Sequence, residues 1–268
     1  GTVAQSTNNS VGVAGLAFGA AVMPVKVLNQ NGSGSYADVA EGVRFAADHG
    51  AKVINMSLGG PSGASYLEEA VAYAYNKGVT VVAAAGNDGA STLSYPAAYN
   101  NYVIAVGATR YNKTRASYSN YGAGLDLVAP GGDTSVDQNG DGYVDGVLQQ
   151  TFGRRYNDFG YYFYQGTSMA APHAAAAAAL VIAHGNATTP AQVRSALESS
   201  AEDLGSAGWD SQTGWGLLDV AAALGAGSPP PPPPPTDNPP TVSLTSPAEG
   251  ATVSGTVSLE ASASDDNG

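Results

Sequence analysis

Cysteine is absent from the 268 residues, so no disulfide framework can hold the fold together. Cysteine content therefore gives no information about the redox compartment in which the protein works. Basic residues are scarce, with 10 Lys and Arg against 22 Asp and Glu and a formal net charge of −12. Nucleic acids require a basic surface, so this balance argues against a nucleic-acid partner. It is suited instead to the binding of cations.

Long apolar runs are absent as well. No stretch of roughly 18 apolar residues occurs, so we expect no membrane-spanning helix. No signal-peptide pattern opens the chain, whose first residues have the character of the middle of a domain. Hydrophobic residues nevertheless make up 43% of the chain, which is enough for a sizeable core.

Residues 1–225 alternate between strand-like and helix-like patterns. The helical patterns cover residues 36–49 and 66–77, and a glycine follows each of them. Strands are expected at residues 22–28, 52–57, 79–85 and 102–108. This rhythm predicts an α/β fold with a doubly wound parallel sheet, helices on both faces, and ligands at the carboxyl ends of the strands.

The last 43 residues differ in composition from the first 225. Residues 226–240 form a linker with seven consecutive prolines, which we interpret as a polyproline II spacer rather than as a ligand for an SH3-like partner. Residues 241–245 and 256–261 alternate apolar and polar side chains, as half-buried strands do. Residues 241–268 look like the start of an immunoglobulin-like β-sandwich, which needs about 100 residues when complete.

The most informative stretch is Gln165-Gly166-Thr167-Ser168-Met169-Ala170-Ala171-Pro172-His173. It leads into a run of small residues that predicts a closely packed helix. A serine at the beginning of a helix lies in a favourable positive potential, and Pro172 is tolerated in the first turn. The pattern G-x-S-x-A differs from the G-x-S-x-G elbow of α/β-hydrolases.

This string resembles the active-serine signature of the subtilisin family. One departure is Ala174-Ala175-Ala176, where the family commonly has Val-Ala-Gly. Further blocks resemble that family in the same order, at residues 53–60, 81–89, 94–96 (with Pro96 a candidate cis proline), 103–108, 128–131 and 213–216. The resemblance covers residues 1–225 and implies a subtilisin-like three-layer fold and serine endopeptidase activity.

The resemblance also implies roles for individual residues. Ser168 would be the nucleophile, with its own backbone N–H and the amide of Asn87 holding the oxyanion. Without the resemblance, Asn87 would be interpreted as a turn residue. The substrate backbone would add as a strand along Ser57, Leu58 and Gly59. The walls of the primary pocket would be Ala84, Ala85 and Gly86, whose small size suggests broad or apolar specificity.

None of the three histidines suits the role of general base. His173 points roughly 140° away from Ser168 around the helix, and His184 lies about 24 Å along it. His49 precedes a strand, at the wrong end of the sheet. We therefore assign all three to packing, capping or surface. Residues 1–9 resemble the stretch after the family's H-G-T-H-V-A block, so we expect the catalytic His and Asp upstream and this chain alone to be inactive.

An acidic loop predicts a calcium site. Its motif D-x-N-x-D-G-x-x-D places oxygen ligands at alternating positions with Gly at the sixth. The twelfth position of an EF-hand loop is Leu148 here, so Asp133 is a candidate substitute; the alternative is an acidic turn without metal. The expected ligands are Asp133, Asp137, Asn139, Asp141, Asp145 and the carbonyl of Tyr143.

A second calcium site is implied by the resemblance alone. Residues 7–13 match the family's N-terminal calcium loop, in which Thr7, Val11 and Val13 would supply carbonyls and Asn9 its side chain. Other ligands of that site come from further upstream in the family.

Residues 133–165 form an insertion that also carries seven aromatic residues. We favour a local aromatic mini-core over a substrate platform for them. The ring-bearing residues are Phe152, Tyr156, Phe159, Tyr161, Tyr162, Phe163 and Tyr164.

Two functions remain in competition. The first is an exported, calcium-stabilised endopeptidase that acts as a monomer on protein or peptide substrates. The second is a pseudoenzyme or surface-binding protein that uses the fold and the β module for adhesion. The presence of both Ser168 and Asn87 favours the enzyme.

Overall fold

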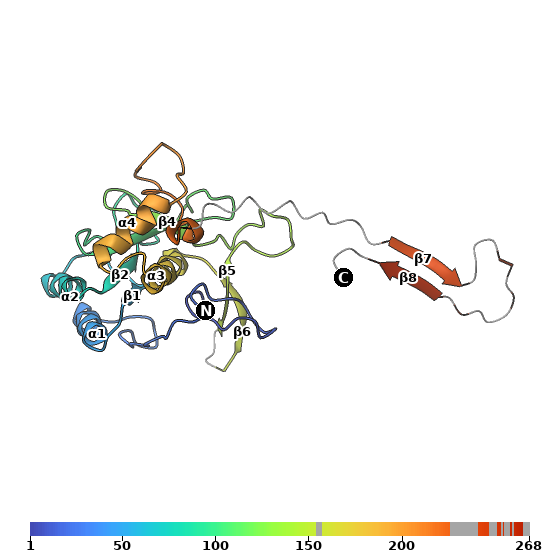
Figure 1. The fold of residues 1–268 in the computed structure, drawn as a ribbon, viewed down its shortest axis with the longest axis horizontal. Coiled ribbons are helices and arrows are strands. Elements are labelled where there is room, and N and C mark those ends of the chain that lie inside the picture. Colours follow the sequence, from blue (N-terminus) through green and yellow to red (C-terminus); the bar gives the residue numbers. More distant parts are fainter. Residues whose placement is uncertain are drawn as a thin grey trace. The chain divides into compact units, whose positions relative to one another are not determined.

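The computed structural model describes residues 1–153, 157–225, 241–246, 251–252, 254, 258 and 260–264. The chain divides into two compact units, Gly1–Gly227 and Ser228–Gly268 (Figure 1). The helices of the first unit are α1 (Tyr36–Asp48), α2 (Ser65–Asn76), α3 (Thr167–His184), α4 (Pro190–Ser200) and α5 (Val220–Ala223). Its strands are β1 (Val53–Met56), β2 (Thr80–Ala84), β3 (Val103–Thr109), β4 (Leu127–Pro130), β5 (Val147–Phe152) and β6 (Phe159–Tyr164).

The central sheet is parallel throughout. Its strands lie in the order β1-β2-β3-β4, so each strand pairs with the next along the chain. Val82 of β2 pairs with Ile104, and Val106 of β3 with Leu127. Parallel neighbours require crossover connections, and α2 supplies the one between β1 and β2. The predicted α/β class with a parallel sheet is confirmed.

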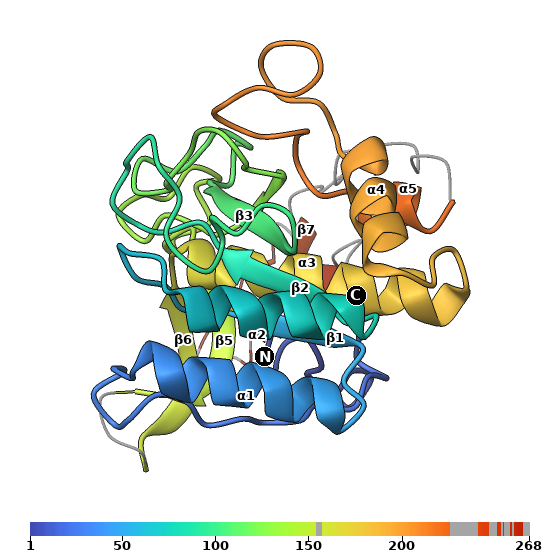
Figure 2. The same cartoon turned by 90° about the vertical axis from the view of Figure 1, so that its left-hand side faces the viewer.

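Both faces of the sheet are buried, which explains the near-continuous apolar sequence of its strands. On one face Val81, Ala83 and Ala105 pack against α1 and α2. On the other face Val82, Ala84 and Ile104 pack against the alanine-rich α3 and against α4. Figure 2 shows α1 and α2 together on one side of the sheet. Successive residues of one strand therefore enter different cores, as the period of two requires.

Local signals set the helix ends. The Ser35 hydroxyl accepts a hydrogen bond from the backbone N–H of Asp38, whose carboxylate accepts one from the Ser35 N–H, so a capping box opens α1. Thr189 and Gln192 form a second box at α4. Helices α1 and α2 each end two residues before a glycine, Gly50 and Gly78, close to the predicted boundaries.

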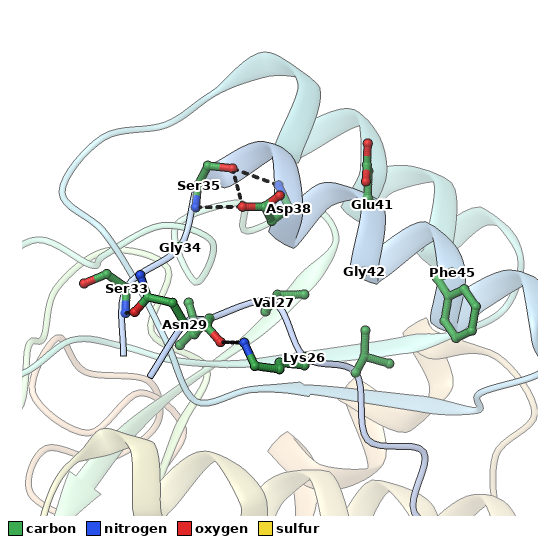
Figure 3. Close-up of a pocket in the computed structure, with 12 residues that line it drawn as sticks. Lys26, Val27, Asn29, Ser33, Gly34, Ser35, Asp38, Glu41, Gly42 and Phe45 are labelled. Atoms are coloured by element: carbon green, nitrogen blue, oxygen red, sulfur yellow. Dashed lines mark hydrogen bonds between the residues drawn. The ribbon is translucent and has the colours of Figure 1, made fainter. Parts of the chain in front are cut away.

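The strand predicted at residues 22–28 is wrong. That segment forms no strand, because a strand is defined by its ladder of hydrogen bonds and no strand pairs with it among the described residues. It runs instead along α1, where a Cβ on Gly42 would lie 2.4 Å from Cγ1 of Val27. Figure 3 shows the surface groove of about 830 Å³ between this segment and α1; it contains none of the predicted site residues.

The insertion before α3 forms an antiparallel hairpin of β5 and β6, with Val147 opposite Tyr164 and Phe152 opposite Phe159. The rings of Phe152 and Phe159 meet edge to face at 5.0 Å, and Tyr143 lies 6.1 Å from Phe163. Two pairs of rings thus contact each other, but Phe152, Phe159 and Tyr161 remain about half exposed. Tyr156 lies outside the described residues.

The second unit contains an antiparallel pair, β7 (Thr241–Ser246) and β8 (Glu260–Ser264). The second strand starts later than the alternation at residues 256–261 predicts, and residues 256, 257 and 259 lie outside the described ones. So does the linker at 226–240, with its prolines. In the described part of the chain, no helix has the length and apolarity needed to cross a membrane.

Candidate active site

The carboxyl edge of the sheet brings together residues that lie far apart in the sequence. Ser168 is the second residue of α3, and Ser57 follows β1 at the same edge. The Ser168 hydroxyl donates to the Ser57 carbonyl at 3.2 Å, and the Ser57 hydroxyl donates to the Ser168 carbonyl at 2.8 Å. The nucleophile candidate is therefore half-buried and held at the end of β1.

The side chain of Asn87 is oriented by the residue next to Ser168. Its Oδ1 atom accepts from the backbone N–H of Thr167 at 2.8 Å and from the Thr167 hydroxyl at 2.9 Å. Because a backbone N–H can only donate, the contacting atom must be the oxygen of the amide. The amide nitrogen has no partner among the described residues, so it is the group left to donate to a ligand at this exposed edge.

The loop that carries Asn87 is held by hydrogen bonds and by a close backbone approach. Oδ1 of the buried Asn120 accepts from the backbone N–H groups of Asp88 at 2.8 Å and Ala90 at 3.1 Å. Gly86 has a φ of 114°, and a Cβ there would lie 2.3 Å from the Asn120 amide nitrogen. Only glycine fits at this position. Asn120 was not predicted from the sequence, because it acts on a loop 30 residues away.

A second clamp holds the turn into α3. The Gly166 N–H donates to the Gly131 carbonyl and to the Tyr118 hydroxyl, both at 3.0 Å, and Tyr118 donates in turn to the Gly132 carbonyl at 2.7 Å. Burial raises the pKa of Tyr118 to about 12, so this hydroxyl keeps its proton at neutral pH. The sequence offers no sign of this role for Tyr118.

The structure confirms that none of the three histidines contacts Ser168. His173 Nδ1 lies 2.8 Å from the Met169 carbonyl, one turn back in the helix. His184 contacts Asn186 at the end of α3, and His49 stacks on Phe45 at the end of α1. All three histidines thus make local contacts on or beside their own helices, as predicted from the sequence.

A cavity of about 330 Å³ adjoins Ser168 on the side of the N-terminal segment. Besides Ser168, it is lined by Met169 and Pro172 of α3, Gln149 of the hairpin, Val22, and residues 1–5. Gln149 is fixed there because its Nε2 donates to the Thr2 hydroxyl at 2.8 Å. The cavity is therefore bounded partly by the insertion.

The predicted substrate-binding residues lie at the same edge. Gly59 is exposed, Ser57 and Leu58 are half-buried, and an antiparallel bridge between Gly60 and Tyr95 follows, with the peptide bond before Pro96 in cis. The side chains of Ala84 and Ala85 are buried, 4% and 0% exposed. Of the three predicted pocket residues, only Gly86 offers partly exposed surface.

The carboxylates of the acidic loop (residues 133–145) bind its own backbone. Asp137 accepts from the N–H groups of Gly140 at 2.7 Å and Gly142 at 3.0 Å, Asp141 accepts from Tyr143, and Asp145 accepts from Gln138. As they lie, no three acidic or histidine side chains of the described residues are grouped to hold a metal ion. The donors still fit calcium in kind, since they are exposed oxygens at alternating positions of a curled loop.

Asp133 differs from the other acidic residues of this loop. It forms an ion pair with Arg110 Nε at 2.9 Å and accepts from the Ser135 hydroxyl, and these contacts lower its pKa, the Ser135 bond most strongly. A carboxylate already neutralised in this way is a poor substitute for the missing twelfth ligand. In the N-terminal loop, Asn9 Oδ1 accepts from the Val11 N–H at 3.1 Å, and Thr7 and Val13 are half-buried.

Comparisons with known proteins agree with this geometry. Residues 1–216 match the subtilase family and residues 240–268 match a bacterial Ig domain. The chain is 44% identical over 223 residues to subtilisin Savinase from Lederbergia lenta, covering 83% of this chain and 74% of that protein. It is equally similar to an alkaline protease from Alkalihalobacillus alcalophilus, of which it spans 53%.

Among solved structures, it resembles one described as proteases from Pseudoalteromonas arctica. The TM-score is 0.75 at 39% identity, and the similarity covers 84% of this chain and 68% of that one.

Proposed function

The chain belongs to the subtilase family, and from that premise we propose that it is a serine endopeptidase with Ser168 as its nucleophile. The observation that carries this is the arrangement around Thr167, which fixes Asn87 by its oxygen and leaves the amide nitrogen to donate beside Ser168. Donors fixed before the reaction stabilise a developing oxyanion without reorganisation. The backbone N–H of Ser168, near the beginning of α3, is the second donor.

In this proposal the Ser168 hydroxyl attacks the scissile carbonyl, and its proton passes to an imidazole. That imidazole comes from a segment N-terminal to Gly1, since the three histidines of this chain are engaged elsewhere. The cavity beside Ser168 offers the space for it to approach the hydroxyl. The substrate backbone adds along residues 57–59, and the primary pocket at Gly86 gives broad or apolar specificity.

Calcium is the proposed cofactor, and it would stabilise the fold without joining the chemical step. Asp137, Asn139, Asp141, Asp145 and the Tyr143 carbonyl would hold one ion, with Asp133 outside the set because of its pairing with Arg110. Thr7, Asn9, Val11 and Val13 would contribute to a second. We also propose that the protein is secreted and monomeric and acts on protein or peptide substrates.

The test is the rate at which a fluorophosphonate probe labels Ser168. A chain extended upstream through the H-G-T-H block should label rapidly, and this 268-residue chain should label slowly because an unactivated serine hydroxyl is a weak nucleophile. Ser168→Ala in the extended chain is the control for specific labelling, and circular dichroism establishes folding in each case. Slow labelling of a folded, extended chain would contradict the proposal and favour an adhesive role. Rapid labelling of the short chain would mean that a base exists within residues 1–268.

A further inference from the structure

The acidic loop contains an Asn-Gly pair whose surroundings suit a covalent reaction. Asn139 and Gly140 are both exposed, and Gly140 has a φ of 74°. Asparagine is among the thermally labile residues, because the backbone nitrogen that follows it can attack its side-chain amide. Glycine makes this attack easiest, since it has no side chain to obstruct the approach and adopts the conformation of the turn without strain.

Three hydrogen bonds place the reacting groups. The Gly140 N–H donates to Asp137 Oδ1 at 2.7 Å. Asn139 Oδ1 accepts from the Asp141 N–H at 3.2 Å, and Asn139 Nδ2 donates to Asp141 Oδ2 at 2.9 Å. The attacking nitrogen thus contacts a carboxylate, the carbonyl to be attacked is polarised by a donor, and the leaving nitrogen is held at a second carboxylate.

We propose that Asn139 is a site of self-catalysed deamidation, and that Asp137 and Asp141 accelerate the reaction. The Gly140 nitrogen bonds to Cγ of Asn139 while its proton passes to Asp137, a contact of the length at which side chains act as general bases. The proton returns from Asp137 to Nδ2 through the solvent around this exposed loop, the Cγ–Nδ2 bond breaks, and ammonia leaves. The product is a cyclic imide that joins residues 139 and 140.

Water then opens the ring in one of two ways. Addition at Cγ gives aspartate, and addition at the main-chain carbonyl carbon gives isoaspartate, in which the chain runs through the former side chain. In sum one water is consumed and one ammonia is released. Aspartate adds a negative charge at the third position of the loop, whereas isoaspartate lengthens the main chain by one carbon and displaces Asp141 relative to Asp137.

The chain contains its own control, the pair Asn31-Gly32. Asn31 is also exposed, and the Gly32 N–H also takes part in a hydrogen bond. Its acceptor, however, is the backbone carbonyl of Asn29 at 3.0 Å, which cannot take a proton as a carboxylate does. No hydrogen bond of the Asn31 side chain is found among the described residues. The two pairs share the dipeptide and differ in the surrounding groups.

One part of the inference rests on the proposed calcium site. A cation bound by Asp137 and Asn139 would withdraw the carboxylate from the Gly140 N–H and fix the Asn139 side chain. Calcium should therefore slow deamidation at Asn139 and leave Asn31 unaffected. The deamidated fraction of Asn139 would then increase with the time that the protein has spent without calcium.

The experiment incubates the purified chain with a chelator or with calcium and quantifies both peptides by mass spectrometry over time. Labelling by an isoaspartyl methyltransferase separates the two products. With chelator, Asn139 should react roughly 5- to 10-fold faster than Asn31, as one additional hydrogen bond in the transition state would give. Asp137→Asn keeps an acceptor oxygen but no carboxylate, and should lower the Asn139 rate towards that of Asn31.

An Asn139 rate in chelator that is equal to or lower than that of Asn31 would overturn the inference, whether or not the variant folds. Faster reaction at Asn139 that calcium does not change would support the modification and overturn its link to a calcium site. Because Ser168 is not involved, neither outcome bears on the proposed peptidase activity.

Discussion

Replacement of Asn87 by alanine in the catalytically complete protein tests the centre of the proposed mechanism. It should lower kcat by about 10²–10³, or roughly 2.7–4 kcal/mol, with little change in KM. This magnitude is the one measured in subtilisin itself for the corresponding oxyanion donor, and it is adopted here for a relative of that enzyme. The structure also shows which groups orient Asn87, and it therefore predicts a smaller loss of kcat for a variant that removes only one of these groups.

Two donors hold the amide oxygen of Asn87, and Thr167→Val removes only one of them. The Thr167 backbone N–H remains at 2.8 Å. One neutral hydrogen bond is worth about 0.5–1.5 kcal/mol, which predicts a loss in kcat of roughly 2- to 13-fold. The melting temperature should fall as well, because the Thr167 hydroxyl also accepts from the Gly86 N–H inside the core. Asn87→Ala should lower the melting temperature too, because it leaves the backbone N–H of the buried Thr167 without its acceptor.

Asn87→Asp completes the series. It keeps an oxygen for Thr167 and replaces the amide donor with an acceptor that repels the oxyanion, so it should be at least as damaging as alanine. The assay is the hydrolysis of a chromogenic peptide anilide, with kcat and KM separated and melting curves for each variant. An unchanged kcat in Asn87→Ala, or a larger kcat loss in Thr167→Val than in Asn87→Ala, would refute the assignment.

Three further outcomes are expected. Calcium should raise the melting temperature by mass action on the folded state, and Asp141→Ala should remove most of that gain; identical melting with calcium and with chelator in the parent chain would exclude the site. Burial lowers the pKa of His173 below its ordinary value, so the unfolded chain binds more protons and stability should fall as the pH drops below about 6.5. Urea midpoints should show this loss in the parent and not in His173→Gln, and parallel pH profiles would contradict it. Limited proteolysis should trim the tail, whose pair of strands is too small to be stable alone, back towards Gly225 and leave a resistant core. A tail as resistant as the core would contradict this.

The sequence predicted those parts of the fold whose cause is local. Apolar residues at helical spacing followed by a glycine marked both early helices, and short apolar runs marked three strands of the sheet, to within two residues. Helix geometry alone was enough to separate His173 from Ser168. The strand at residues 22–28 failed because a strand also needs a neighbour, and no local pattern shows whether one is present.

The predicted site was incomplete for a similar reason. Ser168 and Asn87 were found through long family-like strings, but the groups that orient them were not. Thr167 stood within the quoted string without a role, because its partner Asn87 lies 80 residues away. Tyr118 and Asn120 accept hydrogen bonds from backbone N–H groups that lie 48 and at least 30 residues away in the sequence, and every sequence has such groups. Nothing in the residues themselves indicates such contacts.

The insertion between β4 and α3 is closed at its base. Asp133 bridges to Asp145, and Gln165 accepts from the backbone N–H and the hydroxyl of Thr134. The two ends of the insertion therefore lie next to each other, close to Gly166. The entropic cost of closing a loop grows only slowly with its length, so residues added between these two ends change the stability of the parallel sheet little. Evolution, or a protein engineer, can therefore lengthen, shorten or exchange the part of this insertion beyond Gln149 and Gln150, provided that these two residues keep their contacts with Thr2 and Gln5 beside Ser168.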